Sequence, residues 1–117
     1  MGSGLRVLVI DDDPDFLQFA REGLGGAEVD VARTPLEALW ILERKTIDAV
    51  LCDLVLAHSD GLDLLEAVRV RWPQATRVLV TGFSDRLGDD HATPTAQAVV
   101  RKPCDLGELR QLLTALA

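Results

Sequence analysis

Polar side chains follow four short apolar segments of this chain, and their types suggest one kind of chemistry. In chain order they are Asp11, Asp12, Asp53, Thr81 and Lys102. Carboxylates that lie close together repel one another unless a cation intervenes, and Mg²⁺ is a hard divalent ion that prefers oxygen ligands. With such an ion bound, one carboxylate can attack phosphorus, while a hydroxyl and an ammonium group stabilise charge on the phosphoryl oxygens. The set therefore predicts Mg²⁺-dependent phosphoryl transfer to an aspartate.

These side chains can meet only if the apolar segments form neighbouring strands. Nearly continuous valine-rich runs indicate strands buried on both faces, as in a parallel sheet covered by helices. One further run alternates polar and apolar residues, which suits an edge strand with one face toward water. The five expected strands, with the alternating run second, are residues 6–11, 28–32, 49–53, 77–81 and 98–102.

Capping residues indicate where the helices between these strands begin. The four expected N-caps are Asp13, Thr34, Asp60 and Asp105. A proline follows each of the first two, and Glu37 completes a capping box with Thr34. The side chains expected to face the core from the second helix are Leu36, Leu39, Trp40 and Ile41. A helix is also expected near residues 84–97, where Gly88 and Pro94 predict a short or irregular one.

The alternation of strands and helices predicts an α/β fold. Five consecutive βα units form a doubly wound parallel sheet with helices on both faces. Ligands of such sheets bind beyond the carboxyl ends of the strands. The polar side chains named above would therefore gather at one edge of the sheet.

Composition narrows the class of protein. The 117 residues suit one domain, and hydrophobic residues, at 48% of the chain, are enough to build one core. The net charge of −7 argues against a nucleic-acid partner, because nucleic-acid-binding domains usually present a basic face, but it suits divalent cations. The longest apolar runs are only a few residues long, whereas a membrane span needs about 20, so no membrane contact is expected.

The start of the chain and its cysteines predict the domain boundary and the compartment. Residues 1–4 are expected to be a cloning scar or a disordered lead-in, which leaves residues 5–117 for the domain. No signal peptide with a basic and an apolar part opens the chain. Cys52 and Cys104 have no metal-binding spacing, and Cys52 lies within an apolar run. A reducing, cytoplasmic location is therefore expected.

Five short motifs give the chain a resemblance to the response-regulator receiver domains of bacterial two-component systems. In the family's order and at its usual separations, they are VIDD (9–12), LCD (51–53), DG (60–61), VTG (80–82) and KP (102–103). The resemblance covers essentially the whole chain. It implies a flavodoxin-like topology with strand order 2-1-3-4-5 and a Mg²⁺-dependent phosphoacceptor domain in a phosphorelay.

The resemblance also implies how the metal and the acceptor are arranged. Asp53 would take the phosphoryl group from a phosphohistidine on a sensor histidine kinase or a histidine phosphotransfer protein. Asp12 would bind Mg²⁺ directly and Asp11 would assist, often through water. Asp53 itself and the backbone carbonyl of Val55 would complete the protein ligands.

The remaining roles implied by the resemblance concern the phosphoryl group and the signal. Thr81 would donate a hydrogen bond to the phosphoryl group, and Lys102 would pair with it. The domain would be a signalling module with self-catalysed phosphotransfer, not an enzyme, and would act by conformational change on an output domain or a partner protein. No direct contact with nucleic acid is implied.

Ala57 and Val99 depart from the residues usual in the family, and Val55 and Phe83 bear on the lifetime of the phosphoryl group. A proline is usual at the position of Ala57, so the loop after Asp53 is expected to be slightly looser, with no loss of chemistry. The switch position of the fifth strand, usually Tyr or Phe, is Val99, so signalling through an inward-turning ring is not expected. Val55 and Phe83 lie two residues after Asp53 and Thr81, at positions that flank the path of the hydrolytic water in this family, and both are apolar. They predict slow autodephosphorylation, because neither side chain can position that water.

Three alternatives share part of the pattern. A haloacid dehalogenase-type phosphatase also uses an aspartate nucleophile, Mg²⁺, a hydroxyl and a lysine, but its nucleophile would be Asp11, and its motif continues to a Gly-Thr that is absent here. A flavodoxin-like or dinucleotide-binding module needs a phosphate-binding loop where this chain has residues 11–13, all aspartates. A degenerate receiver that acts only by protein binding is disfavoured by the complete set of acceptor residues.

Overall fold

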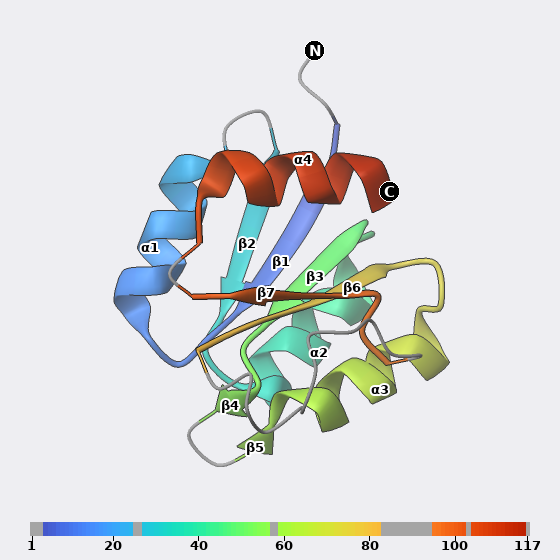
Figure 1. The fold of residues 1–117 in the computed structure, drawn as a ribbon. Helices are drawn as coiled ribbons and strands as arrows, with labels where there is room; N and C mark the ends of the chain where they lie inside the picture. Colours follow the sequence, from blue (N-terminus) through green and yellow to red (C-terminus); the bar gives the residue numbers. More distant parts are fainter. Residues whose placement is uncertain (1–3, 25–26, 57–58, 83–94, 103, 117) are drawn as a thin grey trace.

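A parallel sheet forms the centre of the protein (Figure 1), in a computed structural model that describes residues 4–24, 27–56, 59–82, 95–102 and 104–116. Its strands are β1 (Arg6–Ile10), β2 (Glu28–Ala32), β3 (Ala49–Cys52), β6 (Thr76–Thr81) and β7 (Ala98–Arg101). They lie in the order β2-β1-β3-β6-β7, and each neighbouring pair is parallel. Numbered along these five strands, the order is 2-1-3-4-5, so the predicted doubly wound topology is confirmed.

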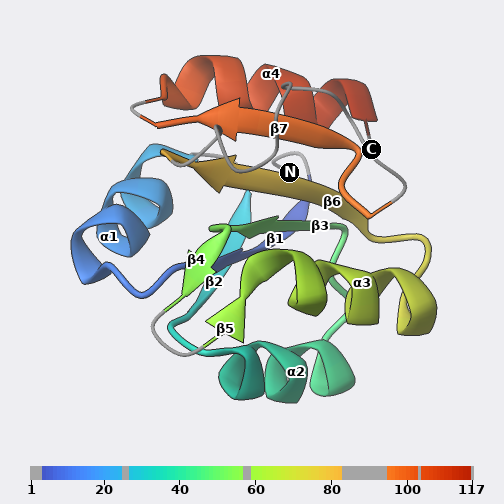
Figure 2. The same cartoon turned by 60° about the horizontal axis from the view of Figure 1, so that its bottom comes forward.

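Helices cover both faces of the sheet (Figures 1 and 2), which explains the continuous apolar runs of the central strands. One face carries α1 (Pro14–Gly23) and α4 (Leu106–Leu116), and the other carries α2 (Pro35–Arg44) and α3 (Gly61–Arg71). Along β1 and β3, alternate residues are buried in the two opposite core clusters. The positions of β1 and β3 that lie between the two layers of helices are therefore apolar.

The sequence predicts the exposure of one edge strand correctly and that of the other incorrectly. The alternating strand β2 lies at an edge, as expected. The last strand, β7, lies at the other edge, and its residues are half-buried or exposed. The expectation that this run is buried on both faces was wrong, because apolar composition alone does not distinguish a strand covered by helices from one at the sheet edge.

The predicted caps begin the helices. The side chains of Asp13, Thr34 and Asp60 accept hydrogen bonds from the backbone N–H groups of Asp15, Glu37 and Leu62, at 2.9, 3.1 and 2.8 Å. Asp105 does the same for the first turn of α4, with the N–H of Gly107 at 2.6 Å. Each of these contacts satisfies an N–H that the helix itself cannot bond.

The apolar stripe expected on α2 was partly wrong. Ala38 and Leu42 face the core, whereas Leu36 and Trp40 are 79% and 56% exposed. Positions two residues apart are rotated by about 200° around a helix, so these two pairs lie on nearly opposite faces. The guanidinium of Arg44 lies 4.0 Å from the centroid of the Trp40 ring and covers part of its exposed surface.

A short antiparallel ladder, which the sequence did not predict, shapes the loop after β3. It consists of β4 (Val55–Leu56) and β5 (Ser59–Asp60), and it leads directly into α3. At the junction, the N–H of Gly61 donates to the carbonyl of Leu54 at 2.7 Å. A Cβ at Gly61 would lie 1.9 Å from the carbonyl oxygen of Asp53, so only glycine allows this close approach.

Two expectations concern segments that this structure does not describe. The irregular helix was expected within residues 84–97, of which residues 84–94 lie outside the described part of the chain. The lead-in was expected at residues 1–4, of which residues 1–3 also lie outside it. Among the helices that are described, none combines the length and apolar character needed to cross a membrane.

Replacing Gly61 with alanine should lower the free energy of unfolding by about 3 kcal/mol, because the added methyl group overlaps backbone of the loop after β3. Urea unfolding monitored by circular dichroism measures the change. Gly82→Ala is the matched control, since a Cβ at Gly82 would have nothing within 4 Å. Equal unfolding midpoints for the two variants would contradict the tight approach at Gly61.

Candidate functional site

Backbone hydrogen bonds fix the two aspartates that follow β1 and β3. The N–H of Asp11 donates to the carbonyl of Ala32 at 3.1 Å, one residue beyond the end of β1. The N–H of Asp53 donates to the carbonyl of Ile10 at 3.0 Å, one residue beyond the end of β3. Both residues thus extend the ladder of the sheet, and their carboxylates leave the same edge from fixed positions.

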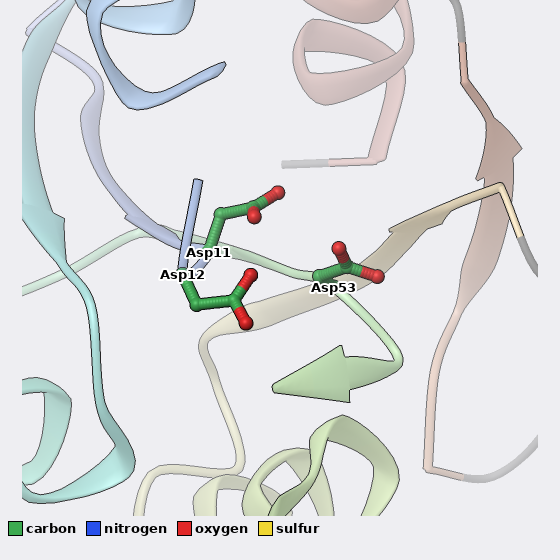
Figure 3. A group of neighbouring side chains, drawn as sticks. All are labelled: Asp11, Asp12 and Asp53. Carbon is green, nitrogen blue, oxygen red and sulfur yellow. The ribbon is translucent and has the colours of Figure 1, made fainter. Parts of the chain in front are cut away.

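Three carboxylates gather at this edge, as Figure 3 shows. Asp11 and Asp12 come from the segment between β1 and α1, and Asp53 comes from the end of β3. One oxygen of each lies within 4.8 Å of the others. Asp11 and Asp53 are only 1% and 8% exposed, whereas Asp12 is half-buried. The structure thus brings together the acidic residues that the sequence singled out.

Lys102 enters the same crevice from the segment after β7. Its Nζ donates to Asp11 Oδ2 at 2.6 Å and to Asp53 Oδ2 at 3.0 Å. Its side chain is 23% exposed. A single ammonium group therefore bridges carboxylates from two different strands and offsets part of their mutual repulsion.

The burial of this ion cluster shifts two of its pKa values. Burial raises the pKa of the Asp11 carboxyl, although the hydrogen bonds from Lys102 and from the N–H of Asp13 oppose the shift. Burial by itself would lower the pKa of Lys102, but its hydrogen bonds to Asp11 and Asp53 outweigh burial and raise it. Lys102 therefore stays charged at neutral pH. Keeping Asp11 ionised in this buried position lowers the stability of the folded state.

The hydrogen bonds leave the three carboxylates with different capacities to bind a cation. Asp11 accepts from the N–H of Asp13 with Oδ1 and from Lys102 with Oδ2. Asp53 accepts from the N–H of Val55 with Oδ1 at 3.2 Å and from Lys102 with Oδ2. Among the described residues, no group donates to the Asp12 carboxylate. An all-oxygen set of this kind fits Mg²⁺, and Asp12 is the carboxylate of the three with the most free capacity to bind it.

The structure describes some of the other predicted site residues fully and others only in part or not at all. Thr81 ends β6 at the same edge of the sheet, and its side chain lies outside the described part of the structure. Val55 lies in β4, and its carbonyl stays a predicted ligand. Phe83 lies outside the described residues. Val99 is half-buried on β7 and packs against the core cluster under α2 and α3.

Two neighbours of the site were missed by the sequence argument. The guanidinium of Arg33, just after β2, donates to the backbone carbonyl of Asp12 at 3.4 Å. The ring of Phe16, in the first turn of α1, lies 4.4 Å from Nζ of Lys102, measured to the ring centroid. The sequence pattern around Phe16 gives no sign of this contact, because Lys102 lies 86 positions further along the chain.

Comparisons with known proteins place this geometry in a family. The family model for the response regulator receiver domain matches residues 7–114. The chain is 34% identical to the response regulator protein PilR of Pseudomonas aeruginosa, over 95% of this chain and 26% of PilR. It is 29% identical to the photosynthetic apparatus regulatory protein RegA of Rhodobacter capsulatus, over 98% of this chain and 64% of RegA. The chain thus spans only part of each relative.

A solved structure shows the same fold. A CheY-like response regulator receiver domain protein from Methanospirillum hungatei superposes with a TM-score of 0.82 and is 26% identical. The match covers 97% of each chain. The likeness in fold therefore extends over nearly the whole chain.

Asp12→Asn should weaken Mg²⁺ binding by about tenfold or more, a loss of about 1.4 kcal/mol, because it removes the carboxylate with the most free oxygen capacity. Titration with MgCl₂, followed by calorimetry or by the rise in unfolding temperature, measures the affinity. Asp15→Asn, which makes the same charge change on the exposed first turn of α1, should change the affinity little. If both variants lost affinity equally, general charge and not the cluster would be attracting the cation.

Proposed function

The chain belongs to the family of response regulator receiver domains, and on that premise we propose that Asp53 is its phosphoacceptor. Receiver domains are signalling domains, and the phosphoacceptor role fits this chain. The observation that carries the assignment to Asp53 is its position. Its buried carboxylate shares Lys102 with Asp11, and one of its oxygens lies within 4.8 Å of an oxygen of Asp11 and of Asp12.

The proposed reaction transfers a phosphoryl group from a phosphohistidine to Asp53. A carboxylate oxygen of Asp53 attacks phosphorus, a P–O bond forms, the P–N bond to the imidazole breaks, and the imidazole leaves with the bonding electrons and takes up a proton. Lys102 turns an N–H from Asp53 toward the phosphoryl oxygens, and the Thr81 hydroxyl donates a further hydrogen bond to them. Asp12, Asp53 and the Val55 carbonyl would hold Mg²⁺, with Asp11 assisting through water, and the bound ion would supply positive charge at those oxygens.

The proposal extends to partners and location. The donor is a sensor histidine kinase or a histidine phosphotransfer protein, and the phosphorylated chain acts on an output domain or a partner protein in the cytoplasm. Two observations support this choice of partners. The net charge of −7 disfavours direct binding to nucleic acid, and curated relatives such as PilR are regulators about four times as long as the part that this chain matches.

Incubation with acetyl phosphate and Mg²⁺ should add the mass of one phosphoryl group to the protein, and Asp53→Ala should abolish the gain. Intact-protein mass spectrometry measures it, and borohydride trapping with peptide mapping locates it. Asp63→Ala, on the exposed first turn of α3, is the control and should be labelled like the wild type. A label on Asp11 would instead indicate the haloacid dehalogenase-type reaction, and labelling that persists in Asp53→Ala would contradict the assignment.

The apolar side chain of Val55 predicts a long-lived phosphoryl group. Val55→Asn should shorten the half-life of the phosphorylated protein, because an amide can orient a hydrolytic water that valine cannot. Phosphate release after removal of the donor measures the half-life. Val55→Thr is a control of similar shape, and it should change the half-life less than asparagine does. An unchanged rate in Val55→Asn would refute this explanation of slow dephosphorylation.

A further inference from the structure

We propose that Phe16 is a positioning residue, which holds the ammonium group of Lys102 inside the acidic crevice during phosphoryl transfer; this inference rests on the proposed function. Nζ of Lys102 lies over the Phe16 ring, 4.4 Å from its centroid. Phe16 is half-buried in the first turn of α1 and packs against the core cluster between that helix, α4 and the sheet. The ring is therefore held in place by the core and presents a face to the lysine.

The surroundings of the ammonium group show what the ring contributes. Two of its hydrogen bonds go to Asp11 and Asp53, at 2.6 and 3.0 Å. The face of an aromatic ring attracts a cation through its quadrupole, most strongly where water is partly excluded, as it is around this 23% exposed side chain. Unlike a carboxylate, the ring leaves the N–H groups of Lys102 free to turn toward another acceptor.

This difference matters once a divalent cation occupies the site. The carboxylates of Asp11 and Asp53 then share their charge with that cation, which also repels the ammonium group. The attraction that holds Lys102 in the metal-free protein is thus weakened at the stage when Lys102 is needed at the phosphoryl oxygens. The attraction of the Phe16 ring is not shared with the cation, so it keeps the long, flexible lysine side chain from moving out into water.

Phe16→Leu separates this role from a purely structural one. Leucine retains an apolar side chain against the core and removes the ring face. The phosphorylation rate with acetyl phosphate at saturating Mg²⁺ should fall about fivefold, equivalent to about 1 kcal/mol. Mg²⁺ affinity should stay the same or increase, because a less firmly held lysine competes less well for Asp11 and Asp53. General damage to the site would instead lower both the phosphorylation rate and the Mg²⁺ affinity.

Two further variants complete the comparison. Phe16→Tyr restores a ring and should recover the wild-type rate. Phe19→Leu is the matched control, because Phe19 lies on the same helix, is 46% exposed, and has its ring centroid 6.2 Å from that of Phe16. It should leave both the rate and the Mg²⁺ affinity unchanged.

A spectroscopic measurement tests the contact without any phosphoryl donor. Protons above the face of an aromatic ring resonate upfield, so the ε-methylene protons of Lys102 should be shifted upfield in the wild type and in Phe16→Tyr, but not in Phe16→Leu. Equal Lys102 shifts in wild type and Phe16→Leu overturn the proposal. A normal phosphorylation rate in Phe16→Leu, or a rate that Phe16→Tyr fails to restore, also overturns it. If Asp53 is never labelled, the proposed function fails on its own, and the chemical shifts still decide whether the ring holds the lysine.

Discussion

Repulsion among three carboxylates at one edge of the sheet is the constraint on which this structure depends. Asp11 and Asp53 are almost fully buried, and Asp12 lies beside them. Buried charges of one sign destabilise a fold unless a counter-charge is present, and Lys102 is the cation among the described residues that reaches two of them. One ammonium cannot neutralise three carboxylates. The crevice therefore keeps a net negative charge that a divalent cation can offset.

The backbone keeps the carboxylates from relaxing apart. On a flexible loop, like charges would separate into water, but here Asp11 and Asp53 each donate a backbone hydrogen bond that continues the ladder of the sheet. The close contact of Gly61 with the carbonyl of Asp53, together with the short β4–β5 ladder, fixes the loop that follows. The stability of the parallel sheet thus maintains the crowding, which is how a site can be preorganised for a metal ion and a phosphoryl group.

Most of the fold and the acidic centre could be predicted from the sequence because they depend on local and periodic signals. Buried parallel strands give continuous apolar runs, N-caps have characteristic residues, and the carboxyl ends of parallel strands share one edge. The faces of α2, the exposure of β7 and the β4–β5 ladder were not predicted correctly, because they depend on the phase of a helix or on tertiary partners. The contact between Phe16 and Lys102 is of the same kind: both residues have ordinary local roles, and only the packing of α1 beside the end of β7 brings them together.

The position of Lys102 also bears on how the acceptor can influence the rest of the domain without an aromatic ring at Val99. Lys102 follows β7 directly, so in the proposed function this edge strand carries the ammonium group that turns from Asp53 toward a phosphoryl oxygen. Within the described residues, β7 pairs with β6 alone, and strands at an edge open at lower free-energy cost than central ones. Val99, half-buried on β7, packs against the core cluster beneath α2 and α3. A displacement of β7 would therefore change the packing of Val99 directly.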